Sequence, residues 1–175
     1  MFGSAYGFRN AVGAAVHAGA LLALTGAVAW VTGTPFVFPS LGPTAYLLAS
    51  QRTRDRGRLW RVVAGHVVGV VAGYLSYHAL GAGVVVTADL APRSPELAAV
   101  VASGVLALAL TTAAMRALDA VHPPACATTL IVSLGLLPTV REGVLIVLAV
   151  VALVGAHDLG MRAGRAVWTE RAVAE

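Results

Sequence analysis

Hydrophobic runs dominate the chain and divide it into regularly spaced segments. Four of them are long enough, or nearly so, to cross a bilayer as helices: about Ala11–Thr32, Leu59–Leu80, Glu96–Met115 and Glu142–Leu159. Between them lie two shorter apolar segments, each opened by proline: Pro39–Ser50 (PSLGPTAYLLAS) and Pro123–Leu137 (PPACATTLIVSLGLL). The pattern predicts an all-α membrane protein that forms a single transmembrane domain over residues 1–175.

The composition supports a membrane protein. Of the 175 residues 58% are hydrophobic and only 11% are charged, whereas soluble domains have about 25% charged residues. The pI near 10.0 would suit a nucleic-acid partner, but all 12 basic residues are arginines, and they gather at the ends of apolar runs. That distribution is typical of membrane topology. We therefore expect a multi-pass protein of the cell (plasma) membrane, in contact with the lipid bilayer and with no nucleic-acid partner.

The positions of the arginines predict how many segments cross. The densest basic stretch, RTRDRGRLWR, spans residues 52–61, and further arginines flank the apolar runs at positions 9, 116, 162, 165 and 171. If both short segments also cross, ten of the twelve arginines share one side, with only Arg93 and Arg141 on the other. Cytoplasmic flanks collect arginine. The sequence thus predicts six crossings, with the N- and C-termini cytoplasmic.

The two halves of the chain repeat the same order of segments. Each contains a long helix, a proline-led short half-helix and a second long helix, over residues 11–80 in the first repeat and 96–160 in the second. Three crossings per half is an odd number, so the repeats are expected to be inverted. Inverted repeats with short, broken segments in matching places point to a transport site near the bilayer midplane.

The two short segments predict an anion site. A helix of about 12 residues covers only about 18 Å of a hydrocarbon core of about 30 Å, so the remainder must be extended and enclosed by protein. The helices should begin near Ser40 and near Pro123 or Pro124, which brings both N-termini, with free N–H groups and positive dipole ends, toward the midplane from opposite sides. The residues expected to bind the anion are Ser40, Leu41, Gly42, Thr44, His122, Pro124, Ala125, Cys126, Thr128 and Thr129. Alternatively, the prolines only cap tightly packed broken helices, with Ser and Thr bonded to their own backbone.

Three titratable residues are candidates for gating or proton relay: His66, His17 and Asp119. His66 should face the interior of the bundle rather than lipid. His122 can bind the anion when protonated, carry a coupling proton, or cap the backbone while neutral.

Other polar residues have structural interpretations. Asp119 is expected to pair with Arg116, and Asp158 with Arg162 one turn later. The remaining histidines, His78 and His157, are expected near helix ends, where interfacial water would solvate them.

The glycines of GHVVGVVAG, at positions 65, 69 and 73, give one smooth helix face for close packing, which also suggests a homo-oligomer. Cys126 is the single cysteine, so the chain has no internal disulfide and no ordinary four-ligand zinc set. Neither an HExxH nor a GxSx motif occurs, and no two histidines are spaced i,i+4. We therefore expect neither an enzyme nor a bound metal or cofactor.

Three blocks, in order, resemble the HPP family of integral membrane proteins: FPSLGPTAYLL, the Arg61…GHVVG stretch, and HPPACATTL, which contains the tripeptide that names the family. The resemblance extends from about Ala11 to Arg162. Family members are often drawn with four spans. Chloroplast and cyanobacterial members are nitrite transporters, so the resemblance implies transport of a small inorganic anion, with nitrite as one candidate. The spacing of residues does not select nitrite over nitrate or formate. The alternative is a membrane structural or signalling component that transports nothing.

Overall fold

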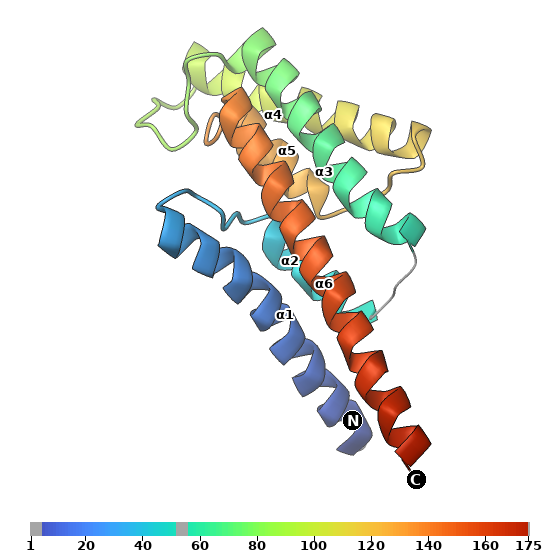
Figure 1. The fold of residues 1–175 in the computed structure, drawn as a ribbon. Coiled ribbons are helices and arrows are strands. Elements are labelled where there is room, and N and C mark those ends of the chain that lie inside the picture. The colour runs from blue at the N-terminus through green and yellow to red at the C-terminus, as the bar shows by residue number, and fades with distance from the viewer. Residues whose placement is uncertain (1–4, 52–55, 175) are drawn as a thin grey trace.

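The computed structural model describes residues 5–51 and 56–174, and the regular structure in these two ranges is helical (Figure 1). Arg52 and Arg54 of the predicted basic stretch lie outside the described residues. The elements are α1 (Ala5–Thr32), α2 (Leu41–Gln51), α3 (Arg56–Ser76), η1 (Tyr77–Gly81), α4 (Pro95–Ala117), α5 (Ala125–Ser133) and α6 (Val140–Ala174), with η1 a π-helical continuation of α3. The predicted all-α class and the positions of all six segments are confirmed.

Four helices of the described chain are long and apolar enough to cross a membrane. Their spans are Asn10–Thr32, Gly57–Gly81, Pro95–Ala117 and Val140–Ala163, which match the four long predicted segments. Helix α6 extends well beyond the predicted end at Leu159 and has 35 residues. The sequence becomes polar after Leu159, so the predicted apolar segment ended there. The helix continues because this polar sequence contains no proline and is rich in Ala and Arg, which favour helix.

Helices α2 and α5 are short, with 11 and 9 residues, which corresponds to about 16 Å and 14 Å of rise. Non-helical chain precedes each of them, as predicted. Helix α1 ends where Gly33 adopts a φ of +64°, a left-handed conformation that suits glycine at a helix C-terminus. Helix α5 ends in the same manner at Gly135, with a φ of +76°, where a side chain would also collide with the backbone of Val84.

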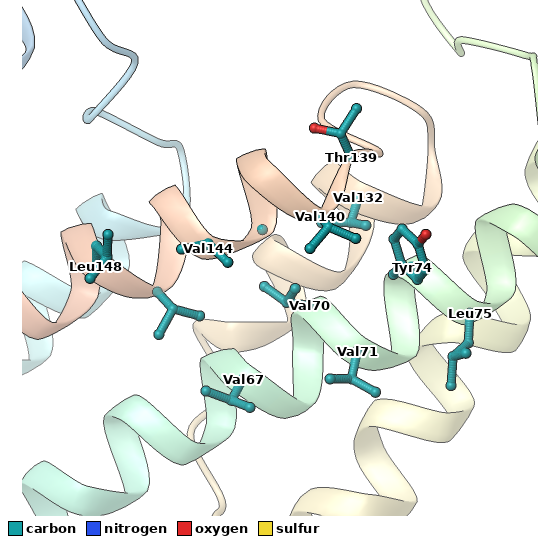
Figure 2. A pocket seen from close by; sticks show the side chains of 12 residues that line it. Val67, Val70, Val71, Tyr74, Leu75, Val132, Thr139, Val140, Val144 and Leu148 are labelled. Carbon is teal, nitrogen blue, oxygen red and sulfur yellow. The ribbon is translucent and has the colours of Figure 1, made fainter.

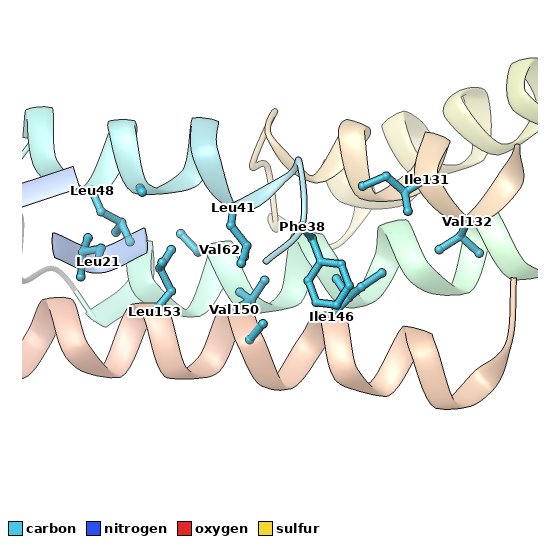
Figure 3. Close-up of a cluster of buried hydrophobic side chains, with 12 residues drawn as sticks. Leu21, Phe38, Leu41, Leu48, Val62, Ile131, Val132, Ile146, Val150 and Leu153 are labelled. Atoms are coloured by element: carbon cyan, nitrogen blue, oxygen red, sulfur yellow. The ribbon is translucent and has the colours of Figure 1, made fainter. Parts of the chain in front are cut away.

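The apolar core lies where α2, α5 and the loop between α1 and α2 pack against α6 and one face of α3 (Figure 3). Phe38 and Leu41 point toward Ile146 and Val150 of α6. Leu41 was predicted to contribute to the anion site, but its side chain is fully buried in this core. In a membrane, close side-chain packing rather than exclusion of water holds such helices together.

The predicted glycine face of α3 packs directly against α5. A Cβ atom at Gly69 would lie 2.8 Å from the Ala125 carbonyl oxygen, and one at Gly73 would lie 2.9 Å from the Thr129 carbonyl oxygen. Real Cβ atoms do not approach backbone so closely, so only glycine permits this contact. Packing as the purpose of these glycines is therefore confirmed, but their use as an oligomer interface is wrong, because α5 already covers them. The homo-oligomer itself stays a prediction.

Contacts between neighbouring elements define two ends of the bundle. At one end, which we call the basic end, Arg61 near the start of α3 lies 3.1 Å from Asp119, just after α4. At the opposite end, His78 of η1 lies 3.3 Å from the Pro138 carbonyl oxygen, just before α6. The first residues of α1 and the last of α6 lie together in Figure 1.

Candidate functional site

A chain of polar side chains is buried where α2, α3, α5 and the α4–α5 loop meet. The hydroxyl oxygen of Thr44 lies 3.0 Å from Nε2 of His66 and 3.2 Å from Nε2 of His122. On its other side, Nδ1 of His66 lies 2.7 Å from the hydroxyl oxygen of Thr128. All four side chains are buried. We call these residues the His–Thr cluster: it joins three predicted anion-binding residues to His66, which faces the bundle interior as predicted.

The hydroxyl of Thr44 fixes how the protons are arranged in the His–Thr cluster. It has one hydrogen, which it donates to the Ser40 carbonyl oxygen at 3.0 Å, since a carbonyl can only accept. Both imidazoles must then donate their Nε2–H to the Thr44 oxygen, and Nδ1 of a neutral His66 accepts from Thr128. Two imidazole N–H groups therefore converge on a single oxygen, which is an arrangement that suits an oxyanion.

Helices α2 and α5 begin on the two sides of His66, since Thr44 and Thr128 each lie in the first turn of their helix. From there the helices run apart in opposite directions (Figure 3). Both positive dipole ends therefore lie next to the His–Thr cluster. Their approach to the bilayer midplane from opposite sides stays a prediction.

The N–H groups at the start of α5 are not free, contrary to the prediction. Those of Ala125, Cys126 and Ala127 donate to the carbonyl oxygens three residues earlier, at 2.9–3.1 Å. The turn formed by His122, Pro123 and Pro124 supplies these acceptors, because it already winds in the helical direction before α5 begins. The donors available to a ligand on this side are thus side chains.

Ser40 has a buried hydroxyl without a hydrogen-bond partner among the described residues. Leaving such a group unpaired costs about 1–3 kcal/mol. Ser76 and Ser133 share this property elsewhere in the bundle, but Ser40 lies one turn before Thr44 and its carbonyl accepts the Thr44 hydrogen bond. The described residues therefore place an unpaired polar group one turn of helix from Thr44 of the His–Thr cluster.

The other predicted anion-binding residues lie in different surroundings. The hydroxyl of Thr129 turns away to α4, where it lies 2.8 Å from the hydroxyl of Thr111. Gly42 lines a separate hollow with residues of α1 and the α1–α2 loop. Pro124 and Ala125 form the turn at the start of α5, and Cys126 is half-buried there.

A cavity of ≈ 250 Å³ opens beside His122 at the basic end. We call it the basic vestibule, and its lining residues are Leu47, Leu48, Gln51, Arg58, Arg61, Val62, Val121, His122 and Pro123. Arg58 donates a hydrogen bond to the side-chain oxygen of Gln51. His122 thus lines the basic vestibule and also bonds to Thr44 of the His–Thr cluster.

Asp119 pairs with Arg61 rather than with Arg116, so that part of the prediction is wrong. Arg61 donates to the Asp119 carboxylate at 3.1 Å and to its backbone oxygen at 3.2 Å. Asp119 has a φ of 49°, and this left-handed turn after α4 carries the chain across to α3. A gating role for Asp119 stays a prediction.

A second pair of histidines joins α1 to α6. Nε2 of His17 lies 3.0 Å from Nδ1 of His157, and the two rings meet edge to face. His157 is fully buried, so its expected solvation near a helix end is wrong, because α6 continues to Ala174. The Asp158–Arg162 ion pair is confirmed at 2.6 Å. The histidine partners lie far apart in sequence, and no local pattern predicted their contact.

A larger cavity, of ≈ 330 Å³, lies between α3 and α6 (Figure 2). Valine and leucine side chains such as Val71 and Val144 line it, and Tyr74 and Thr139 stand at one end. These apolar walls provide almost no polar groups to bind a charged solute. The cavity therefore suits contact with lipid hydrocarbon rather than binding of an anion.

The transmembrane-region model of the HPP family matches residues 4–161, a range that includes the His–Thr cluster and the basic vestibule. The chain belongs to the HPP family. It is therefore a membrane protein, in agreement with its four apolar spans. No curated protein and no solved structure matches the chain.

Proposed function

We propose that this HPP-family protein is a membrane transporter or channel for a small inorganic anion, with nitrite as the first candidate substrate. One observation carries the proposal: the His–Thr cluster, beside the unpaired hydroxyl of Ser40, is buried at the meeting point of two short helices. Ionisable side chains inside a membrane bundle are energetically costly and mark ion or proton pathways.

The proposed topology has six crossings, arranged as two inverted repeats over residues 11–80 and 96–160. Contacts at the two ends support it. Between Asp119, which lies at the basic end, and Pro138, which lies at the opposite end, the chain contains only one short helix, α5. This segment therefore runs from end to end with a helix too short to span alone. Both termini are proposed to be cytoplasmic, together with the basic end.

In the proposed mechanism, the anion takes the place of the Thr44 oxygen between the two imidazole N–H groups. Rotation of the Thr44 side chain frees both donors, and the hydroxyl of Ser40 is a further donor to the site. A proton taken up by His66 or His122 gives the site a positive charge that compensates the anion. Proton uptake and anion binding would then favour each other.

A second candidate is a membrane structural or signalling component that transports nothing. One observation favours it: every member of the His–Thr cluster already has a hydrogen-bond partner within the protein. A satisfied buried network can serve only to fix the helix arrangement.

The test is anion uptake by purified protein in proteoliposomes, comparing nitrite, nitrate, formate and chloride with protein-free vesicles. His122→Ala should reduce uptake at least tenfold, on the order expected when a charged or strongly hydrogen-bonded contact is lost, and should alter its pH dependence. His78→Ala is the matched control, because His78 is an exposed histidine at the opposite end. Folded wild-type protein that moves none of these anions would exclude the transport function.

A further inference from the structure

We propose that the basic vestibule is a separate binding site for a small anion arriving from water, and that Arg58 supplies its principal charge. That an anion passes from this site to the His–Thr cluster rests on the proposed function. Binding in the vestibule itself does not, and it can be tested without any transport.

Three parts of the chain build the basic vestibule: the last turns of α2, the first turns of α3, and the loop that ends at His122. The imidazole of His122 forms its inner wall and is only 5% exposed. Because Nε2 of this ring bonds to Thr44 at 3.2 Å, His122 belongs both to the vestibule wall and to the His–Thr cluster.

The charges in the basic vestibule are unequally compensated. Arg61 is neutralised by the carboxylate of Asp119 at 3.1 Å. Arg58 instead donates to the neutral amide of Gln51, and none of the residues lining the cavity is acidic. The positive dipole end of α3 and the negative dipole end of α2 both lie at this cavity and offset each other. The described residues therefore leave about one positive charge at this cavity.

The shape of the basic vestibule suits a small, partly hydrated anion. Its volume of ≈ 250 Å³ would hold roughly eight water molecules at about 30 Å³ each. Leu47, Leu48, Val62 and Val121 make up the apolar part of its wall. Apolar walls around a charge strengthen its attraction for ions of opposite sign.

The competing explanation for Arg58 is structural, because an arginine beside the last residue of α2 also compensates the negative dipole end of that helix. A binding site and a helix cap differ in what they do to dissolved ions. Only a binding site raises the local concentration of anions and is occupied by them.

The experiment places a single cysteine in the vestibule, Val121→Cys in a Cys126→Ser background, and measures its modification by anionic and cationic methanethiosulfonate reagents of similar size. Val121 is half-exposed and lines the cavity. We expect the anionic reagent to react faster, and dissolved nitrite or nitrate to slow it. Arg58→Gln should reduce the anionic-to-cationic rate ratio by roughly three- to tenfold, as one charge about 6–12 Å away would at the dielectric constant of water, about 80. Arg58→Lys should preserve the ratio.

Arg116→Gln is the matched control, because it removes the same charge at the end of α4 from a residue that does not line the cavity. Equal rates for the two reagents, or a ratio unaffected by Arg58→Gln, would overturn the proposal. So would protection by anionic lipid in the vesicles but not by dissolved anion, since a lipid headgroup would then be the occupant. A protein with the expected ratio and no anion uptake would refute the proposed function and leave the vestibule site standing.

Discussion

At the residue scale, Thr44 is the centre of the buried polar chain, because its single oxygen accepts hydrogen bonds from both imidazoles. Thr44→Val keeps the shape of the side chain and removes that acceptor. Two buried N–H groups then lose their partner at a position that water cannot easily reach. We expect the variant to be less stable by about 1–3 kcal/mol, measured as thermal unfolding in detergent.

Thr112→Val is the control for this prediction. Thr112 lies on the exposed face of α4, and its hydroxyl bonds only to the Leu108 carbonyl oxygen of its own helix, at 2.8 Å. The same chemical change there should leave the unfolding temperature nearly unchanged. If Thr44→Val were as mild as Thr112→Val, the inferred hydrogen-bond arrangement around Thr44 would be incorrect.

The sequence predicted part of the site at this scale and missed the rest for a physical reason. Thr44, His122 and Thr128 were predicted because prolines fix where helices begin, and that is a local property. The choice of Asp119 as the partner of Arg61 depends on a left-handed turn, and the His17–His157 contact depends on how distant helices pack. Neither leaves a local pattern in the sequence.

At the scale of elements, the contact between α3 and α5 depends on the absence of side chains at three positions of α3. Gly69→Ala would place a Cβ atom 2.8 Å from the Ala125 carbonyl oxygen and 2.9 Å from the Thr129 hydroxyl. Backbone atoms cannot move aside cheaply, so the helices must separate. We expect a loss of stability of about 1–3 kcal/mol and reduced anion uptake, because α5 carries Thr128.

Gly155→Ala provides the comparison, since a Cβ atom there meets nothing within 4 Å. Alanine favours helix over glycine by up to about 1 kcal/mol, so this variant should be neutral or slightly more stable in the same unfolding assay. Similar behaviour of the two variants would show that α3 and α5 do not approach as closely as described.

Hydrophobic runs predicted the elements well, because a membrane imposes a minimum length of apolar helix. The predicted end of the last helix was wrong, because it lies where the chain leaves the apolar region and a minimum apolar length no longer applies. Helix α6 continues into a polar region in which helix propensity rather than hydropathy decides. The prediction of a second copy of the chain as the partner of the glycine face was also wrong. A smooth glycine face indicates close packing, but it does not indicate which helix packs there.

At the scale of the whole molecule, the six-crossing topology makes a prediction about sidedness. Single cysteines at Arg116 and Asp89, in a Cys126→Ser background, should react with impermeant reagents from opposite sides of intact cells or oriented vesicles. Arg116 lies at the end of α4, and Asp89 lies in the loop before this helix. Labelling of both from the same side would contradict the proposed crossing by α4 and the inverted repeats with it.

Tags at the N- and C-termini test whether the two termini lie on the same side of the membrane. The first residues of α1 and the last of α6 lie at the same end of the molecule (Figure 1), so tags at the two termini should report the same side. If the two tags were accessible from opposite sides of the membrane, an even number of crossings would be ruled out.

The core described in Figure 3 has an electrical consequence in a polarised membrane. Ile146, Val150 and Leu153 of α6 seal one side of the short helices with apolar side chains, whereas water can reach His122 through the cavity at the basic end. Voltage falls mainly across the part of a protein that water does not enter. If the proposed transport is correct, an ion crossing from His122 to the opposite end would move through that water-free part, and a full membrane potential of 100 mV is worth about 2.3 kcal/mol per unit charge.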